Sequence, residues 1–129
     1  MPVEIEMHRD NRVILYRFID PMDLSDFADK LRELRPMYDA STHLIHRIID
    51  CTQFNQIPPN FILFCLKDTN LRHIMSGSSI VVTNNTMVIS TAKAVFHASP
   101  SNSLRLARHI NEAWVDMDAI LAREKPIEK

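Results

Sequence analysis

The stretch Thr42-His-Leu-Ile-His-Arg-Ile-Ile-Asp-Cys-Thr52 decides the fold, together with Pro58-Pro59 and the apolar run Phe61-Ile-Leu-Phe-Cys-Leu66 that follow it. An aliphatic run that stops at polar residues is typical of a buried strand, and prolines before a second apolar run are typical of a helix start. In open α/β sheets, functional groups gather beyond the carboxyl ends of the strands. The stretch therefore predicts an α/β domain with ligand or partner contacts after Asp50.

Composition sets the size of the protein and narrows its partners. The chain has 129 residues, 46% of them hydrophobic, which is enough for one domain with a real core. Its formal net charge is -1 and neither sign forms a long block, so no nucleic-acid partner is expected. The chain has no apolar run of about 18 residues and its start lacks the apolar core of a signal peptide. We therefore expect no membrane insertion and a cytoplasmic location.

The glycine, cysteine and histidine content argues against several kinds of site. Gly77 is the only glycine, whereas loops that wrap phosphate need several. Cys51 and Cys65 lie in or beside apolar runs, where reduced cysteine behaves as a small hydrophobe, so no structural disulfide is expected. The histidines form no i, i+4 helical pair and the chain has no Cys-x-x-Cys. Neither a metal nor a cofactor is therefore expected.

The start of the chain predicts a hairpin followed by a helix. Apolar residues alternate with glutamates over residues 3–7, and turn residues 8–11 separate them from the apolar run 13–19, which predicts two antiparallel strands. Asp20-Pro21 predicts a helix start with Asp as N-cap and Pro in the first turn. Because Pro36 disfavours helical geometry in the residue before it, the helix is predicted to end near Arg35.

The middle of the chain predicts a central strand and a second helix. The aliphatic residues between His43 and Asp50 are too continuous for a strand with one wet face, so this strand should lie inside the sheet. Pro58-Pro59 can occupy a helix start but not a strand interior. A helix is therefore predicted from Asn60 to about Arg72.

The last third predicts two more strands and a terminal helix. Ser79–Thr83 is predicted as a strand, Asn84–Lys93 as a short helix and Ala94–His97 as the fifth strand. Ser99-Pro100 is predicted to open the last helix. Its apolar face would be formed by Leu106, Ile110, Ala113, Trp114, Met117, Ile120 and Leu121. The tail 124–129 is expected to fray.

This order of elements resembles the STAS fold, the fold of bacterial anti-sigma-factor antagonists and their SpoIIAA-like relatives. The likeness covers most of the chain, in the order of elements more than in motifs, and it implies that residues 1–129 form one domain with a single mixed β-sheet and packed helices. Locally, Ile48-Ile-Asp-Cys-Thr52 is similar to the strand end of those proteins, where a hydroxyl residue follows an acidic residue two positions on. The resemblance implies a cytoplasmic domain that binds proteins or a small ligand and has no enzymatic activity.

One feature of the family is not carried over. In the phosphorylated antagonists, an aspartate-serine-(serine or threonine)-glycine segment opens the second helix, and its serine is the switch. The corresponding place here reads Ile57-Pro58-Pro59-Asn60, which has neither serine nor glycine. Thr52 then carries the local hydroxyl group that remains a candidate for phosphorylation.

Two groups of residues are candidates for a noncatalytic, regulatory interaction with a protein partner. The polar group follows the central strand and comprises Asp50, Thr52, Gln53, Asn55 and Asn60. The apolar group belongs to a helix that is apolar on every side, so part of it should stay exposed or meet another surface. Phe61, Phe64 and Cys65 are the candidates there, for a homodimer contact or an apolar groove.

Two other functions remain open. In the first, the protein is a carrier or sensor for a small apolar ligand that the same helix shields. In the second, it is an enzyme that uses His46 and Asp50, which lie four apart on one face of the strand and suit a carboxylate-oriented imidazole. Cys51 should face away from that pair, because successive strand residues point to opposite faces.

Overall fold

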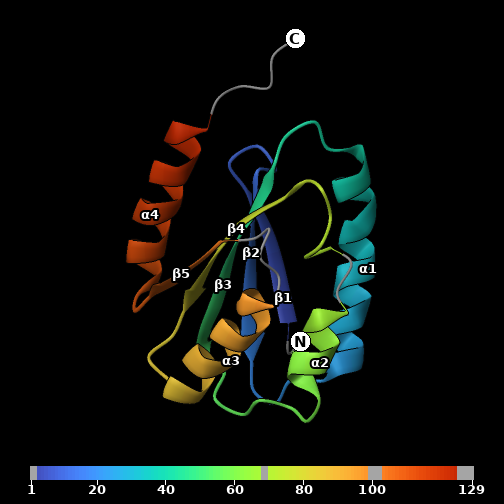
Figure 1. The fold of residues 1–129 in the computed structure, drawn as a ribbon, viewed down its shortest axis with the longest axis vertical. Helices are drawn as coiled ribbons and strands as arrows, with labels where there is room; N and C mark the ends of the chain where they lie inside the picture. The colour runs from blue at the N-terminus through green and yellow to red at the C-terminus, as the bar shows by residue number, and fades with distance from the viewer. Residues whose placement is uncertain (1–2, 68–69, 99–102, 125–129) are drawn as a thin grey trace.

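The computed structural model describes residues 3–67, 70–98 and 103–124, which form one five-stranded sheet with four helices (Figure 1). The strands are β1 (Val3–His8), β2 (Val13–Ile19), β3 (Ile45–Gln53), β4 (Ser76–Val82) and β5 (Leu104–Ala107). The helices are α1 (Leu24–Ala40), α2 (Phe61–Leu66), α3 (Thr86–His97) and α4 (Ile110–Arg123). Strands and helices alternate after the opening hairpin.

The sheet is mixed, and its order follows the chain from β1 to β5. β1 pairs antiparallel with β2, and every later pair is parallel. β3 lies between β2 and β4, which confirms the internal strand predicted from its unbroken aliphatic run. The α/β class, the mixed sheet and the opening hairpin are therefore confirmed.

The two faces of the sheet are covered unequally. Helices α1, α2 and α3 pack on one face, and α4 packs alone on the other (Figure 1). Successive parallel strands lie side by side in chain order, so right-handed crossovers place the connecting helices on the same face. α4 follows the last strand and is free to cover the opposite face.

The larger core is aromatic. Phe18 of β2 meets Phe27 of α1 and Phe54 of the loop after β3, with ring centroids 5.1 and 5.4 Å apart. Phe61 of α2 joins the cluster and stacks on Phe27 at 6.2 Å. The smaller core, beneath α4, is built from compact side chains, with Ala113 and Met117 fully buried against aliphatic residues of β2, β3 and β4.

The predicted bounds of the first helix are wrong at both ends. Asp20 does not cap it, because its carboxylate accepts hydrogen bonds from the backbone N–H groups of the loop after β3 instead. α1 begins at Leu24, and Asp23 caps it by accepting from the Ser25 N–H. The helix also runs past Pro36 to Ala40. Packing outweighs the local cost of proline there, since Tyr38 in the last turn is fully buried.

The second helix is shorter than predicted. α2 ends at Leu66, and residues 70–72 form a turn rather than the helix end expected at Arg72. Asn70 is buried and its side-chain N–H donates to the Leu31 carbonyl of α1 at 2.8 Å. This side-chain bond ties the turn to α1 and replaces the helical geometry predicted at that position.

The fifth strand was predicted in the wrong place. Ala94–His97 is the end of α3, which extends the helix predicted to stop at Lys93, and the fifth strand is Leu104–Ala107. Val88, Ala92 and Val95 are buried at i, i+4 and i+7, so the helical face continues through the segment.

The last helix starts later than predicted. Leu106 belongs to β5 because it pairs with Val81, and α4 starts at Ile110. The predicted start at Ser99-Pro100 lies outside the described residues. Glu124, assigned to a fraying tail, instead holds two side-chain contacts, while residues 125–129 lie outside the described residues.

Within the described ranges, no helix combines the length and the apolar character needed to cross a membrane.

Candidate functional site

At the carboxyl end of β3, two neighbouring residues bond each other through their side chains. The Asp50 carboxylate accepts hydrogen bonds from the Thr52 N–H at 3.0 Å and from the Thr52 hydroxyl at 2.7 Å. Thr52 and Gln53 are exposed. The acidic and hydroxyl residues singled out from the sequence therefore form a side-chain turn that shapes the strand end, and the threonine hydroxyl is engaged in it.

The loop after β3 is held by its neighbours. The Asp20 carboxylate accepts from the N–H groups of Asn55 and Gln56 at 2.8 and 3.0 Å, and the Asp20 N–H donates to the Gln53 carbonyl. The Asn55 side-chain oxygen accepts from Asn85, which caps α3, at 2.9 Å. Asn55 thus fixes the loop to α3, a duty that the sequence did not reveal.

Asn60 stands apart from the other polar candidates. It lies beyond Pro58-Pro59, is exposed and has φ of 65°, so it turns the chain into α2 through backbone geometry without a side-chain cap. The structure therefore gathers Asp50, Thr52 and Gln53 at one strand end and places Asn60 at the start of the next helix.

The helix α2 divides its apolar side chains between the core and the surface. Phe61 is buried, while Phe64 and Cys65 are half-buried and pack against the core. Ile62 and Leu63 are 39% and 53% exposed. The three residues expected to form a dimer contact or apolar groove thus lean inward, and the outer surface of α2 is formed by Ile62 and Leu63 instead.

A cavity of about 80 Å³ lies between the sheet and helices α1, α2 and α3. Phe61 and Cys65 close it from α2, and Cys51 forms part of its sheet wall. Apart from Arg47 and Thr91, its wall is made of hydrophobic side chains and includes aromatic rings from five parts of the chain: Tyr16, Phe18, Phe27, Phe54, Phe61 and Phe96. The site favours an apolar occupant.

Arg47 gives the cavity one polar end. The residue is 4% exposed, and its Nε donates to the Ser79 hydroxyl at 2.9 Å while one terminal nitrogen donates to the Tyr38 hydroxyl at 3.0 Å. The other terminal nitrogen donates to the Ser76 hydroxyl and the Gly77 carbonyl. These bonds hold the guanidinium against β4 and leave the rest of the wall apolar.

The thiol of Cys51 is not set up as a nucleophile. The side chain is 3% exposed, and burial, followed by the nearby Asp50 charge, raises the pKa of Cys51 far above its usual range. Nucleophilic cysteine chemistry needs the thiolate, which these surroundings disfavour. Cys51 therefore serves as a wall of the cavity.

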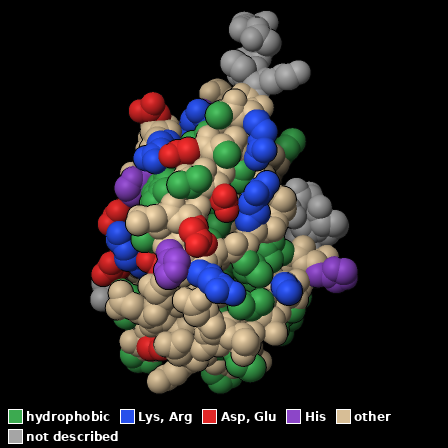
Figure 2. Space-filling model, turned by 90° about the vertical axis from the view of Figure 1, so that its left-hand side faces the viewer, with side chains coloured by type: hydrophobic (Ala, Val, Ile, Leu, Met, Phe, Trp, Pro, Cys, Tyr) green, Lys and Arg blue, Asp and Glu red, His purple; other side chains and the backbone are tan. Residues whose placement is uncertain are grey.

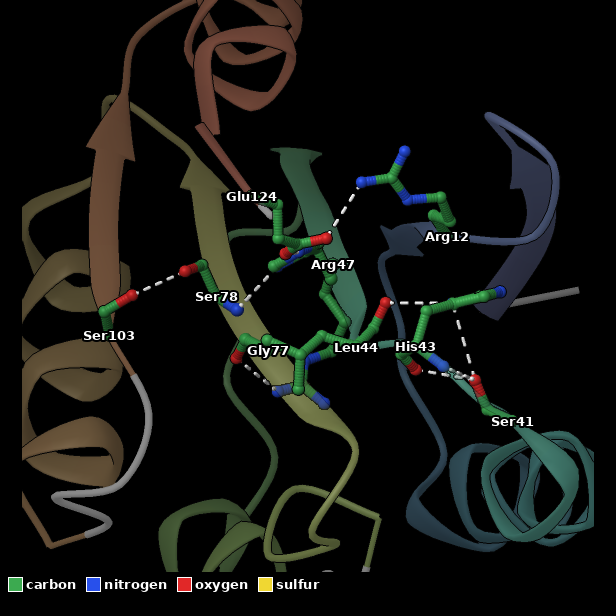
Figure 3. A network of polar contacts seen from close by, with 10 residues as sticks. Arg12, Ser41, His43, Leu44, Arg47, Gly77, Ser78, Ser103 and Glu124 are labelled. Atoms are coloured by element: carbon green, nitrogen blue, oxygen red, sulfur yellow. Dashed lines mark hydrogen bonds and ion pairs between the residues drawn. The ribbon is translucent and has the colours of Figure 1, made fainter. Parts of the chain in front are cut away.

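On the opposite face, His46 sits in a closed polar network. Its ring is 2% exposed, its Nδ1 accepts from the Ser78 N–H at 2.9 Å, and its Nε2 bonds the Glu124 carboxylate. Arg12 donates to the same carboxylate at 2.8 Å (Figure 3). The network joins the end of α4 to the hairpin turn and to strands β3 and β4.

The titration behaviour of the network follows from its geometry. Burial lowers the pKa of His46, and the hydrogen bond to Glu124 opposes this without reversing it. Burial raises the pKa of Glu124, but the bonds from Arg12 and His46 outweigh burial and leave that pKa below its usual range. The pair is therefore a neutral imidazole beside an ionised carboxylate, with the proton on Nε2.

His46 and Asp50 do not act together. The Asp50 carboxylate binds Thr52, and both ring nitrogens of His46 are occupied by Ser78 and Glu124. A general base needs a free lone pair within reach of a substrate proton, whereas the His46 lone pair already accepts a backbone N–H. This arrangement argues against the predicted alternative of an enzyme built on the pair.

Sequence reasoning missed the α3 wall of the cavity. Val88, Ala92 and Val95 all line it, and their i, i+4, i+7 spacing is the signal that marks one face of a helix. That signal was hidden because Ala94–His97 has the composition of a strand. Among the described residues, no group of three or more His, Cys, Asp or Glu side chains gathers in a way that could hold a metal ion.

Comparisons with protein-family models, with curated proteins and with solved structures each found no match.

Proposed function

We propose that this protein is a noncatalytic binding module that carries or senses a small apolar ligand. The cavity between the sheet and α1, α2 and α3 supports the proposal most strongly, because it is lined almost wholly by hydrophobic side chains. Ligand sites are typically concave, mostly apolar and equipped with a few polar groups that fix orientation. Arg47 and Thr91 are the polar groups in this wall.

The energetic cost of the void also favours an occupant. Protein interiors are close-packed and leave few voids larger than a water molecule. At about 24 cal/mol per Å³, an empty cavity of about 80 Å³ costs the folded state about 2 kcal/mol. A ligand that fills it recovers part of this free energy, whereas water finds few hydrogen-bond partners there.

The helix α2 is the natural place for entry. It has only six residues, it has no side-chain cap, and its Cys65 is half-buried while lining the cavity. Elements with few contacts and exposed backbone open at low free energy. A small displacement of α2 would connect the cavity to solvent without disturbing the sheet.

The order of elements supports a STAS-like architecture for the module. After the hairpin, helices and strands alternate to a terminal helix, as the resemblance to SpoIIAA-like proteins implies. In this proposal the sheet and α1 form the rigid frame, and the ligand lies under α2 and α3. The loop after β3 borders the same region, so a ligand in the cavity would change the conformation of the loop and of the polar strand end before it.

Uptake of small apolar probes tests this function. An engineered dry cavity of about 150 Å³ takes up benzene or xenon, so both are suitable probes, xenon for the cavity as it stands and benzene for one that expands. We expect either probe to raise the melting temperature of the wild type and to shift NMR signals of Ala92 and Val95. Absence of uptake of both probes would contradict the proposal.

A pair of matched variants gives the control. Ala92→Leu adds bulk inside the cavity and should abolish probe uptake while leaving stability unchanged or higher. Ala113→Leu adds the same atoms to the filled core under α4, where overpacking should cost about 1–3 kcal/mol, and should preserve uptake. Probe uptake retained by Ala92→Leu would place the binding site elsewhere.

A second candidate function is protein binding through the outer surface of α2, including self-association. The exposure of Ile62 and Leu63 favours it, because adjacent exposed aliphatic residues on a short helix suit an interface. The cleaner test replaces Leu63 by Glu, since Phe64 packs on Phe27 at 5.3 Å and its replacement would also disturb the core. A wild-type oligomer in sedimentation that Leu63→Glu turns into folded monomer would support this function, and a wild-type monomer at high concentration would count against self-association.

A further inference from the structure

The strand β5 is an edge strand with its hydrogen-bonding pattern open to one side. Among the residues that the structure describes, it pairs with β4 alone, and the ladder includes the bonds from the Ser79 N–H to the Ser103 carbonyl and from the Thr83 N–H to the Ala107 carbonyl, both at 2.9 Å. In a parallel ladder, alternate residues point their backbone groups toward the same neighbour. Leu104 and Leu106 therefore direct their N–H and C=O groups away from the sheet.

A groove flanks this edge on each face of the sheet. On the α3 side, the groove is lined by Lys93, Phe96, His97 and Leu104, among others. On the α4 side, it is lined by Arg105, Arg123 and the Ser78–Ser103 hydroxyl pair, with Leu104 shared between the two. Side chains of an added strand would alternate between these two grooves.

The grooves are basic although the chain as a whole carries a formal charge of -1. Lys93 lines one groove, and Arg105 and Arg123 line the other. Among the described residues that line the two grooves, Glu124 is the only acidic one, and its carboxylate already accepts from Arg12 and His46. Figure 2, which views the side that carries α4, shows Lys and Arg side chains down the right-hand half of that face, whereas basic and acidic side chains are mixed on its left-hand half.

We infer that the outer edge of β5 binds an extended peptide with acidic side chains, which adds a sixth strand to the sheet. Main-chain bonds to Leu104 and Leu106 supply affinity, and Lys93, Arg105 and Arg123 select negative charge. A second copy of this chain is the poorer occupant, because edge-to-edge pairing of two β5 strands would bring Arg105 close to its own counterpart. Phe96 lines both the α3-side groove and the proposed apolar-ligand cavity, but Leu104, Leu106 and these basic residues lie outside the cavity wall, so the two proposals can fail independently.

A pair of capped hexapeptides provides the probe. In one peptide glutamate alternates with valine, and in the other lysine replaces glutamate. We expect the glutamate peptide to bind the full chain with a Kd about tenfold or more below that of the lysine peptide, and to bind more weakly as salt increases. Amide exchange at Leu104 and Leu106 should slow on binding, while Arg105 and Ala107, already bonded to β4, should change less.

Backbone and charge variants decide whether the edge itself is the site. Leu106→Pro removes an outward N–H without removing a bond to β4, and proline is tolerated on edge strands. It should weaken binding about tenfold or more, whereas Leu106→Ala keeps the N–H and should lose far less. Arg105→Glu should lower the preference for the glutamate peptide.

Several results would overturn the inference. These are equal binding of both peptides, no binding of the glutamate peptide, or unchanged affinity in folded Leu106→Pro and Arg105→Glu. A wild-type dimer that Leu106→Pro dissociates would replace the peptide by a second copy of this chain.

Discussion

The two faces of the sheet differ in how their side chains pack against the helices. Under α4, aliphatic side chains of the strands pack against Ala113 and Met117, which are fully buried, and the His46–Glu124 pair ties the end of the helix to the sheet. Under α1, α2 and α3, large aromatic rings leave a cavity of about 80 Å³ beside a short, partly exposed helix. The α2 face retains room that could hold a molecule, and the proposed ligand site therefore lies there.

Truncation of neighbouring isoleucines in β3 should give the largest difference in stability between the two faces of the sheet. Ile48 is fully buried under α4, and Ile48→Ala should cost about 2–5 kcal/mol by leaving a new void in a filled core. Ile49 is half-buried and lines the existing cavity, so Ile49→Ala should cost clearly less. Urea unfolding measures both, and equal losses would contradict the difference in packing.

A substitution at Gly77, which packs against the His46 ring, should give the next largest loss of stability. A Cβ at Gly77 would lie 2.4 Å from the His46 Nδ1, and the ring cannot retreat because Ser78 and Glu124 hold it. Gly77→Ala should therefore cost about 1–3 kcal/mol. The same change in a His46→Ala background should cost much less in a double-mutant cycle, and an unchanged cost there would show that the ring is not the obstacle.

Lowering the pH should reduce the stability of the protein because His46 is buried in its neutral form under α4. Its folded-state pKa is lowered, so just below about pH 6.5 the unfolded chain takes up a proton that the folded chain does not, and stability falls as pH drops through this window. Protonation would also set an N–H against the Ser78 N–H. His46→Gln should flatten the stability profile between about pH 7 and the lowered pKa, and an identical slope in the variant would exclude this role.

The contribution of Glu124 to stability should be lost at lower pH than that of His46. Its pKa is lowered in the folded state, so its contribution is present above the ordinary carboxyl range and is lost only as pH falls through and below that range. Glu124→Gln should therefore change the profile mainly at the acid end. The two profiles, measured by urea unfolding, separate the partners of the network.

The loop after β3 should give the smallest effects on stability. Gln53→Ala should change the free energy of unfolding by less than about 0.5 kcal/mol, because the side chain is exposed. Asn55→Ala should cost about 0.5–1.5 kcal/mol because it removes the bond to Asn85. If the loop contacts a partner, the double variant should lose a pull-down partner that the wild type retains, and retention of every partner would remove the loop from the interface.

The sequence predicted what local patterns control. Alternation over residues 3–7 and the unbroken aliphatic run of β3 correctly gave the hairpin, the internal strand and the mixed sheet. Errors arose where long-range contacts override local preference. Burial of Tyr38 carries α1 through Pro36, and the Asp20 carboxylate bonds a loop distant in sequence instead of capping a helix.

The candidate site was predicted less completely than the fold. The apolar character of residues 61–66 pointed to the right helix, but which of its side chains face inward depends on how α2 lies on the sheet. The cavity depends on the mutual fit of three helices, and the pairing of His46 with Glu124 joins residues 78 positions apart. Neither feature has a local signal in the sequence.

Native mass spectrometry of the protein, purified gently from its own cells, shows whether the cavity under α2 and α3 holds a ligand. We expect an excess mass of a small molecule that disappears on denaturation, that is absent from Ala92→Leu and that persists in Ala113→Leu. A wild-type protein with no bound molecule, together with no uptake of xenon or benzene, would contradict the claim that the cavity is a ligand site.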